Sequence, residues 1–444
     1  MPVFKNEINR HRVQMCTALS AVICLLFSTA PLAQVNSPAG TSVMGSIVLA
    51  EPEAPLTLEA AIRFALESNP NIAAARREIE ASDGQILQSS LRPNPELVYV
   101  TEDTRNVSKA STAQIDIPLE TGGKRKARIA AAERGKNVAV SELSGRLLKL
   151  RASVMAAFFD VLAAQERIAL ARESLQLAQR ATDIAGKRVT AGKVSPVEET
   201  KARVAEGGVR ISLRQAESEL RNARRYLSSL WGNTQPRFTL AQGAIDQLPE
   251  LPDAALIQQR LNSSPIVERA RLELERRKSL VTLEQSRTVP DLTFSVGMKR
   301  REDITRDQVL VGLAIPLPLF NRNQGNLLEA LRREDKARDE LLAASMALSN
   351  DVQQSLERVS ARRDEAELLR SEVLPGAKSA YTAATIGFEN GKFSFLEVLD
   401  AQRTYFASKS QYLSALAAFH RSASDLESLL GPADDVPASL NTKP

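Results

Sequence analysis

The sequence predicts a mainly helical protein with a small β part, built as two copies of one plan around very long helices. Three observations predict this fold class. Apolar residues recur at steps of three and four over stretches far longer than a globular helix. Short segments that alternate apolar and polar residues interrupt that pattern. The same order of motifs then recurs roughly two hundred residues later, which indicates an internal duplication.

The composition fits long helices that pack through small side chains. Aromatic residues make up 4% of the chain, which is low for a compact globular core. Charged residues make up 25% and hydrophobic residues 43%, which excludes a disordered chain and a bundle of membrane-spanning helices. Acids and bases are nearly balanced along the helices, so we interpret the net charge of +5 as solvated faces. No nucleic-acid partner is expected.

The N-terminus, residues 1–33, is predicted to be a signal peptide. Basic residues, of which Arg12 is the last, precede an apolar run from Met15 to Phe27. That run is too short to span a bilayer but suits the core of a secretory signal. Residues 34–55 are rich in Pro, Gly and Ser, and we expect an extended N-terminal arm there. The sequence therefore predicts an exported protein.

The first repeat, residues 56–232, begins with a helix and two strands. Thr57 is the expected cap of a helix that runs to about Leu91. Paired prolines in the motif RPNPEL then end the helix and begin extended structure. Strands are expected at residues 96–103 and 112–119, and the second alternates cleanly between apolar and polar residues.

A very long helical hairpin completes the first repeat. A helical pattern runs from Gly123 to about Ala185 without a proline or an obvious cap. Its sixty-odd residues span ~95 Å at ~1.5 Å per residue. A turn at Gly192 leads into a second helix, which is expected from Ser195 to about Leu230. The two helices should therefore pack as an antiparallel pair.

The second repeat, residues 255–431, follows a linker at 233–254 and precedes a C-terminal tail at 432–444. Its strands are expected at 291–299 and 308–317. Matching motifs of the two repeats lie 195 to 199 residues apart: Ser68-Asn69-Pro70 with Ser263-Ser264-Pro265, Ile117-Pro118-Leu119 with Ile315-Pro316-Leu317, and Gly232 with Gly431.

The tips of the two helical hairpins share a motif. A Gly that ends one helix is followed by Lys, by a Ser that caps the next helix, and by Glu in its first turn. These residues are Gly192, Lys193, Ser195 and Glu198 in the first copy, and Gly391, Lys392, Ser394 and Glu397 in the second.

Strands of nine to eleven residues with one apolar face suit a barrel that spans a bilayer. Four strands cannot close a barrel, because unpaired edges in lipid leave backbone groups without partners. The chain should then assemble with copies of itself. The alternative is a small sheet outside the membrane, which would make the chain a soluble periplasmic coiled-coil scaffold or adaptor.

The segment GKFSFLEVLDAQRTYFASKSQY, the IPL strand ends and the duplicated plan resemble the TolC family of outer-membrane efflux proteins. The resemblance covers about residues 56 to 432. RPNPEL and IPLETGGKRKARIAAAE are most similar to the outer-membrane components of cobalt–zinc–cadmium type cation efflux systems. The resemblance implies a homotrimer in outer-membrane lipid, with a shared twelve-stranded transmembrane β-barrel and a large periplasmic α-barrel. It also implies two partners, a periplasmic adaptor (membrane fusion) protein and an inner-membrane pump of the resistance–nodulation–division class.

The resemblance further implies where the tube narrows. Rings of acidic side chains at the channel constriction fall on Glu397 and Asp400, with Glu198 as the matching acid of the first tip. The alternative is that these are ordinary first-turn acids, which the helix dipole favours. Phe388 and Phe393 neighbour the gate where the family has a hydroxyl-bearing aromatic and a basic residue, so the hydroxyl and the cation of the family's polar latch are missing at these positions. The alternative is that Lys392 or Lys193 substitutes for the cation. The tips, Gly192-Lys193-Ser195 and Gly391-Lys392-Ser394, are the expected docking sites of the adaptor.

No catalytic, cofactor or metal site is expected. Cys16 and Cys24 lie in the predicted signal peptide, as does one of the two histidines, which leaves His420 as the only His of the mature chain. One His and no Cys cannot build a nitrogen and sulfur metal site. The glycine pair before Lys124 lacks the remaining residues of a phosphate-binding loop. We interpret the basic cluster that begins at Lys124 as a solvated helix start, with contact to lipid phosphates as the alternative.

The function expected from the sequence is therefore a passive exit duct, not an enzyme. It would conduct substrates, divalent heavy-metal cations in the first place, from pump and adaptor to the exterior. A multidrug or type I secretion duct of the same fold is the alternative within that class.

Overall fold

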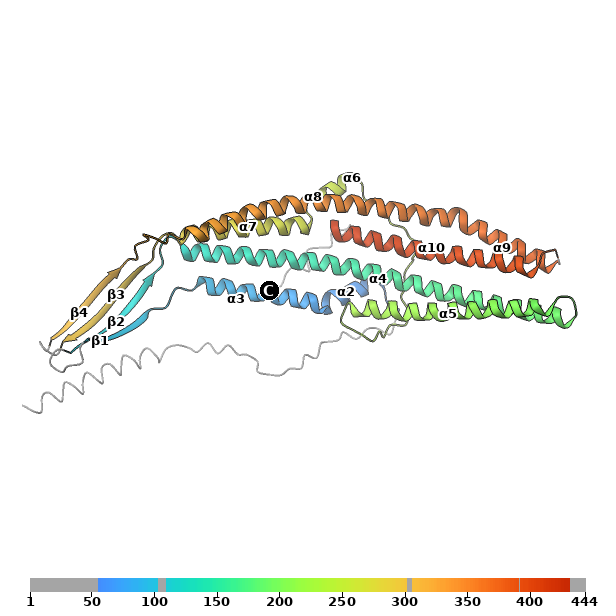
Figure 1. Cartoon of the computed structure of the whole chain (residues 1–444), viewed down its shortest axis with the longest axis horizontal. Coiled ribbons are helices and arrows are strands. Elements are labelled where there is room, and N and C mark those ends of the chain that lie inside the picture. Colours follow the sequence, from blue (N-terminus) through green and yellow to red (C-terminus); the bar gives the residue numbers. More distant parts are fainter. Residues whose placement is uncertain (1–54, 103–108, 302–305, 391, 432–444) are drawn as a thin grey trace, which may run out of the picture. The chain divides into compact units, whose positions relative to one another are not determined.

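The computed structural model describes residues 55–102, 109–301, 306–390 and 392–431 (Figure 1). The predicted signal peptide, nearly all of the predicted arm and the C-terminal tail lie outside these residues, as does Gly391 of the second tip. None of the described helices is long and apolar enough to cross a membrane.

The helix expected from Thr57 to Leu91 is in fact two helices, α2 (Leu58–Ser68) and α3 (Pro70–Ser90). The Thr57 side chain caps α2 as expected, accepting from the N–H of Ala60. The break lies at Asn69, because a following proline disfavours helical backbone at the residue before it. Asn69 also caps α3 and donates from its side chain to the carbonyl of Leu230 (2.7 Å), so the break anchors the end of the first repeat.

The four strands form one antiparallel sheet in the order β1-β2-β3-β4. They are β1 (Glu96–Glu102), β2 (Ala110–Leu119), β3 (Leu292–Arg301) and β4 (Arg306–Ala314). The central pair joins the two repeats, with β2 and β3 in register from Ala110 opposite Arg301 to Leu119 opposite Leu292. Strands β1 and β4 are the two edges, so the sheet of one chain is open on both sides.

The expectation that the fourth strand reaches residue 317 is wrong. Strand β4 ends at Ala314, and Ile315 to Pro318 have no regular structure. Pro316 and Pro318 remove two backbone donors within three residues, which ends strand pairing. In the first repeat a single proline, Pro118, is tolerated inside β2.

One face of the sheet is apolar across all four strands. The cross-strand row Leu97, Ile115, Val296 and Val311 lies on this face, and so does the row Tyr99, Ala113, Met298 and Val309. Their large side chains remain exposed in one chain, Val309 by 76% and Leu97 by 67%. The opposite face carries polar side chains such as Gln114, Asp116 and Ser295. The sheet therefore has the pattern of a surface that faces lipid on one side and water on the other.

The remaining elements are long helices. They are α4 (Lys124–Thr190), α5 (Pro196–Ser229), α6 (Ala254–Asn262), α7 (Pro265–Ser286), α8 (Gln324–Leu368), α9 (Leu374–Glu389) and α10 (Phe395–Leu430), with a π-helical segment η1 (Leu369–Val373) between α8 and α9. Helix α4 has 67 residues, or ~100 Å at ~1.5 Å per residue. It continues five residues beyond the expected end near Ala185.

The π-helical segment interrupts the second long helix just before Pro375. A proline in a helix lacks the N–H for one hydrogen bond, and its ring clashes with the carbonyl four residues before it. The wider turn of η1 relieves this conflict and lets the helix continue into α9. The position 199 residues earlier is Gln176, where α4 runs without interruption.

The helices pack in the same lateral order as the strands to which they connect (Figure 1). Beside the sheet, α3 packs against α4, α4 against α7, and α7 against α8. Toward the hairpin tips, α5 packs against α4, α4 against α10, and α10 against α9. One chain is thus a row of helices continuous with its sheet, and the two ends of the row are α3 with α5 and α8 with α9.

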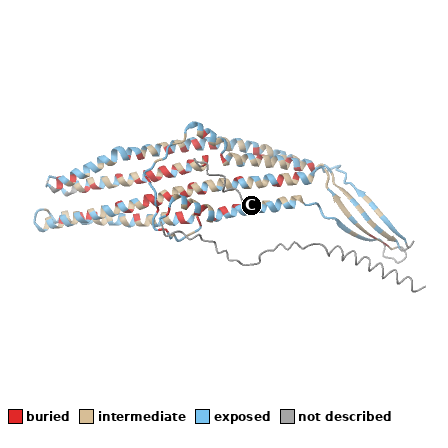
Figure 2. Ribbon diagram, turned by 180° about the vertical axis from the view of Figure 1, so that it is seen from behind, coloured by how far each residue is buried: buried red, intermediate tan, exposed pale blue. Residues whose placement is uncertain are grey.

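The main core lies midway along the helices, where Figure 2 shows the buried residues gathered. Phe158 on α4, Leu227 on α5 and Phe238 in the linker are fully buried there. His420 on α10 lies at the edge of this core. Its ring stacks on Phe159 (centroids 3.6 Å apart), and its Nε2 lies 2.7 Å from the carbonyl of Ile245. Burial lowers the pKa of His420, so the neutral ring donates from Nε2–H to that carbonyl.

Stability should depend on pH through His420. A pKa below the unfolded value of about 6.5 means that the unfolded chain gains a proton first as the pH falls. We expect the free energy of unfolding to drop below pH 6.5 by at most about 1.4 kcal/mol per pH unit. The melting temperature, measured between pH 7.5 and 5.5, should fall less steeply with falling pH in His420→Gln than in the wild type. Glutamine keeps an N–H donor for the Ile245 carbonyl but does not titrate. Equal slopes in the two proteins would contradict this assignment.

Candidate functional site

The first hairpin tip closes through backbone hydrogen bonds and a glycine. Gly192 adopts the left-handed conformation (φ 67°), which glycine reaches without strain. The N–H of Lys193 donates to the carbonyl of Arg188 (2.9 Å). The Ser195 side chain accepts from the N–H of Val197 (3.4 Å) and so caps α5. The predictions that Gly192 ends one helix and that Ser195 caps the next are confirmed.

The described residues of the second tip make matching hydrogen bonds, with one addition. The N–H groups of Lys392 and Phe393 donate to the carbonyl of Gly387 (2.7 and 3.2 Å). The Ser394 side chain accepts from the N–H of Glu397 (3.4 Å), and the Glu397 carboxylate accepts from the N–H of Ser394 (2.6 Å). This reciprocal pair is a capping box, which fixes the start of α10. The first-turn acid thus has a structural role at the helix start.

The acids predicted to line a constriction lie in the first two turns of α5 and α10, next to the tips. Asp400 is exposed one turn after Glu397, and Glu198 is half-buried with its carboxylate 3.6 Å from the ammonium of Lys201. Lys193 and Lys392 are exposed at their tips. In the described part of the chain, no group of three or more His, Cys, Asp or Glu side chains is placed to hold a metal ion.

Phe388 is buried between the two hairpins. Its side chain is 8% exposed. It packs in a cluster with Ala185 of α4, Ala202 and Ala205 of α5, and Leu399 of α10. The guanidinium of Arg188, on the last turn of α4, lies 4.0 Å from the centre of the Phe388 ring. It also donates from Nη2 to the Phe388 carbonyl (3.4 Å). Sequence reasoning missed Arg188, because it lies on the first hairpin and aligns with a glycine of the second.

Phe393 folds back over the end of α9. A side chain at Gly387 would overlap the ring of Phe393, so the glycine provides the space that the ring occupies. Phe393 keeps 44% of its surface exposed. The two phenylalanines of the second tip therefore differ: Phe388 packs inward against the first hairpin, and Phe393 covers its own helix end.

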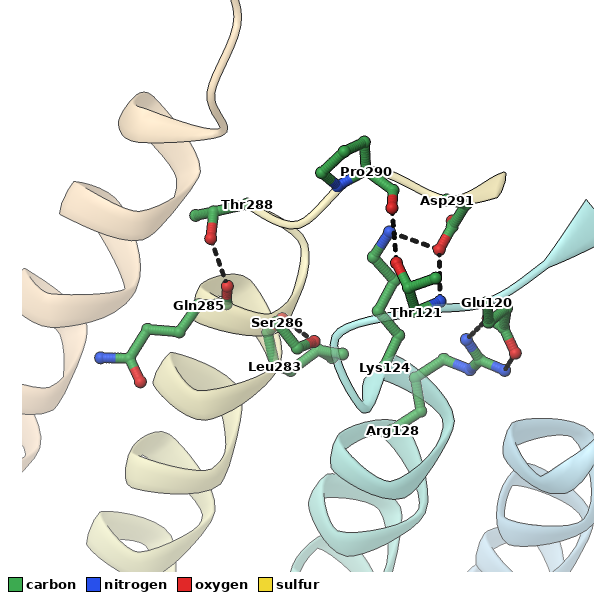
Figure 3. Close-up of polar contacts among 10 residues, drawn as sticks. All are labelled: Glu120, Thr121, Lys124, Arg128, Leu283, Gln285, Ser286, Thr288, Pro290 and Asp291. Atoms are coloured by element: carbon green, nitrogen blue, oxygen red, sulfur yellow. Dashed lines mark hydrogen bonds and ion pairs between the residues drawn. The ribbon is translucent and has the colours of Figure 1, made fainter. Parts of the chain in front are cut away.

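A second polar cluster joins the repeats where the sheet meets the helices (Figure 3). Asp291, just before β3, accepts from the N–H of Thr121 (2.9 Å) and lies 2.8 Å from the ammonium of Lys124. The Thr121 hydroxyl donates to the Pro290 carbonyl. Partial burial acts to raise the pKa of Asp291, but the Lys124 and Thr121 hydrogen bonds outweigh it and lower the pKa overall. The start of α4 is thereby fixed to the start of β3.

The expected solvated helix start is therefore wrong for Lys124 and Arg128, which are half-buried in ion pairs, whereas Arg125 and Lys126 are exposed. Besides Lys124, Arg128 pairs with Glu120 and donates to the carbonyl of Leu91, and Arg125 donates to the carbonyl of Ser90. These contacts tie α4 to the end of α3. Sequence periodicity does not show that strand and helix ends meet here, so these side chains were expected to be solvated.

Gly122 is required at this junction for two reasons. Its φ is +64°, which side chains rarely adopt, and a Cβ there would lie 2.7 Å from the Ser286 carbonyl oxygen. Gly123 also has a positive φ (+73°), but no atom lies within 4 Å of a Cβ built there. Gly122 thus lets the end of α7 pack closely against the start of α4, and Gly123 provides only the left-handed backbone.

Exposed large apolar side chains gather on the elements at the two ends of the row. On the β1 side they are Leu87 on α3 and Val197, Val204, Ile211 and Tyr226 on α5. On the β4 side they are Leu328, Leu331, Leu342, Met346 and Leu368 on α8 and Ile386 on α9. Val204 is 72% exposed and Met346 66%. Both ends of one chain therefore present apolar surface along helices and sheet alike, which is typical of a surface that binds another protein.

Comparison with known proteins agrees with this architecture. The family model described as outer membrane efflux protein matches residues 61–233 and 256–432. The cobalt-zinc-cadmium resistance protein CzcC of Cupriavidus metallidurans is 46% identical over 409 residues, which cover 92% of this chain and 98% of that protein. The nickel-cobalt-cadmium resistance protein NccC of Alcaligenes xylosoxydans is 25% identical over 296 residues, which cover 65% of this chain and 66% of that protein.

Solved structures share the fold. A crystal structure of CusC superposes with a TM-score of 0.72 at 19% identity, covering 85% of this chain and 92% of that one. The outer membrane channel CmeC of Campylobacter jejuni superposes with a TM-score of 0.71 at 15% identity, covering 86% and 88%. The mainly helical fold with four antiparallel strands is therefore that of these channels.

Proposed function

The chain belongs to the outer membrane efflux protein family, and from this premise we propose that it is the exit duct of a tripartite heavy-metal efflux system. The protein is an outer-membrane component, not an enzyme. It would conduct its substrate passively, since energy would come from an inner-membrane pump of the resistance–nodulation–division class. A periplasmic adaptor would join the two.

The observation that carries the proposal is the pair of open, apolar ends of the row. A sheet edge in lipid leaves backbone donors and acceptors unpaired, so β1 and β4 need partner strands. Since every chain offers the same two ends, copies can satisfy each other head to tail and close into a ring. We propose a homotrimer, in which twelve strands form the barrel in outer-membrane lipid and the helices form the periplasmic tube.

The substrate class follows from the relatives. Their names assign resistance to cobalt, zinc and cadmium in one case and to nickel, cobalt and cadmium in another. The first is 46% identical over nearly its whole length, and we infer from it that this duct carries divalent cations of the same kind. Neither of these two names supports the alternatives of a multidrug or type I secretion duct.

Deleting the gene from its host tests this function. In the deletion strain we expect tolerance of cobalt, zinc and cadmium salts to fall severalfold and tolerance of hydrophobic drugs to stay the same. In the wild type we expect the protein to fractionate with the outer membrane as an oligomer. Loss of drug tolerance instead of metal tolerance would favour a multidrug duct. Recovery in the soluble periplasm would favour a coiled-coil scaffold.

Within the duct, we propose that Glu397 and Asp400 form acidic rings at the constriction and that Glu198 adds to them. Like charges brought close together attract cations, so these rings would favour the proposed substrate. The exposed tips around Lys193 and Lys392 are the proposed docking sites of the adaptor.

Removing the ring charges should reduce cation preference. The double variant Glu397→Gln, Asp400→Asn keeps the capping box, since Gln also accepts from the Ser394 N–H. Reversal potentials in planar bilayers with a salt gradient should move toward zero, whereas Asp183→Asn, an exposed acid on α4, should leave them unchanged. Equal selectivity in the double variant and the wild type would refute the ring assignment.

A further inference from the structure

The contact between Arg188 and Phe388 is the strongest feature that the proposed function does not yet use. It joins different hairpins, because Arg188 ends α4 and Phe388 ends α9. Two interactions act at once: the guanidinium faces the aromatic ring at 4.0 Å, and its Nη2 donates to the backbone carbonyl of the same residue. A cation over an aromatic face is attracted by the ring's quadrupole, more strongly where water is excluded.

The surroundings of Phe388 favour such an attraction. The ring is 8% exposed and packs among alanines of both helices of the first hairpin and against Leu399 of its own. Those alanines leave room for one large side chain between the hairpins, and Phe388 fills it. The apolar contact positions the ring, and Arg188 covers it at the tip end.

The duplication explains how the contact arose. Arg188 and Gly387 are equivalent, because each carbonyl accepts from the N–H of the tip lysine five residues later, Lys193 or Lys392. A side chain at Gly387 would overlap the ring of Phe393, so the second copy has no room for a cation at this position. The first copy has that room and directs its cation at the second hairpin.

Further from the tips, the hairpins are joined by polar contacts between α4 and α10. These are Arg151 with Glu427 (3.0 Å), Asp160 with Arg421 (2.8 Å), Arg167 with Ser414 (2.9 Å) and Glu173 with Lys409 (3.7 Å). Arg188 lies fifteen residues beyond Glu173, or ~22 Å along the helix. Among the described hydrogen bonds, ion pairs and cation–π contacts between the hairpins, Arg188–Phe388 is the one nearest the tips.

We propose that Arg188 and Phe388 form a clasp that holds the second hairpin tip against the first and so sets the opening at the periplasmic end. The clasp rests on the proposed duct function, and it takes the place of the polar latch that Phe388 and Phe393 cannot make. A docking partner that separates the tips must break this contact together with the apolar packing of Phe388 against the first hairpin. Arg188 is a positioning residue, since it acts through the second hairpin and not on the substrate.

The test measures the tip spacing directly. The two cysteines of the sequence lie in the predicted signal peptide, so spin labels at Lys193→Cys and Lys392→Cys report on the tips alone. Labelled chains diluted into unlabelled protein restrict the signal to one chain. We expect a narrow distance distribution in the wild type and a broader, longer one in Arg188→Ala. Arg203→Ala removes the same charge at the same tip, where Arg203 pairs with Glu199 of its own helix, and should match the wild type.

Two milder variants keep the test decisive if Arg188→Ala does not assemble. Phe388→Leu keeps an apolar side chain in the cluster but removes the aromatic face, and Arg188→Lys keeps the charge but loses the planar group. Both should broaden the distribution, and the single and double changes at 188 and 388 should be non-additive. A wild-type distribution in Phe388→Leu, or strictly additive effects, would overturn the clasp.

Conductance then separates the clasp from the duct. Single channels of Arg188→Ala should conduct severalfold more than those of the wild type or of Arg203→Ala. If the tips separate but no variant conducts, the clasp stands and the duct function fails. If all variants conduct equally and the tip distances do not change, the duct stands and the clasp is wrong.

Discussion

Replacing Gly122 with alanine should sharply reduce the amount of assembled protein in the outer membrane. Alanine at φ +64° costs about 1–2 kcal/mol from the left-handed backbone alone. Its methyl group would also lie 2.7 Å from the Ser286 carbonyl oxygen and 2.8 Å from Cβ of Val289, and such overpacking adds about 1–3 kcal/mol. The strain falls where α4 begins and α7 ends, so it also disturbs the contacts of Asp291 with Thr121 and Lys124.

Gly123→Ala is the matched control for that prediction. Its backbone is equally left-handed, but nothing lies within 4 Å of the new methyl group. It should lose only the backbone part, about 1–2 kcal/mol. Urea unfolding of the two purified variants, together with their yield as heat-modifiable oligomers, separates the two effects. If the free energy of unfolding falls equally in both variants, the close approach to Ser286 does not contribute to the loss of stability.

Charging the apolar end of α5 should abolish assembly without unfolding the chain. Val204 and Ile211 lie seven residues apart, on one face of α5, and are 72% and 62% exposed in a single chain. Glutamate at both positions costs little in a monomer, because the side chains would face water. In a closed ring the same carboxylates would be buried against α8 or α9 of the next copy, which costs about 3–5 kcal/mol for each unpaired charge.

Sedimentation in detergent should therefore find Val204→Glu, Ile211→Glu as a folded monomer with unchanged helical content, and cells that carry it should lose metal tolerance. Ser212→Glu, exposed on the neighbouring side of α5, adds charge outside the proposed interface and should remain an oligomer. An intact oligomer in the double variant would show that this edge of the row faces solvent.

Local sequence signals predicted most of the fold. The strand alternation, the capping residues Thr57, Ser195 and Ser394, and the repeat of motifs at 195 to 199 residues predicted the helices and strands in order. The misses came from proline in a tertiary context. Pro70 divided a helix, and Pro316 helped to shorten a strand.

The site was less predictable, because its contacts join residues far apart in the chain. The capping role of Glu397 could be read from the Ser394 motif alone. The contact of Arg188 with Phe388 spans 200 residues, and the first hairpin gives no local sign of it. Likewise Lys124 has the appearance of a solvated helix start until Asp291, which lies 167 residues later, is placed beside it. Periodicity predicts which face of a helix is apolar, but not which residue meets it.

Disulfide cross-linking between the two sheet edges tests the central claim most directly. Neither cysteine of the sequence lies outside the predicted signal peptide, so Tyr99→Cys on β1 can be combined with a cysteine at Val309, Val311 or Leu313 on β4. Closure by copies predicts that oxidation in the outer membrane gives covalent dimers and trimers, at one favoured β4 position, and nothing larger. Monomers at every position, or a ladder that continues past three chains, would contradict it.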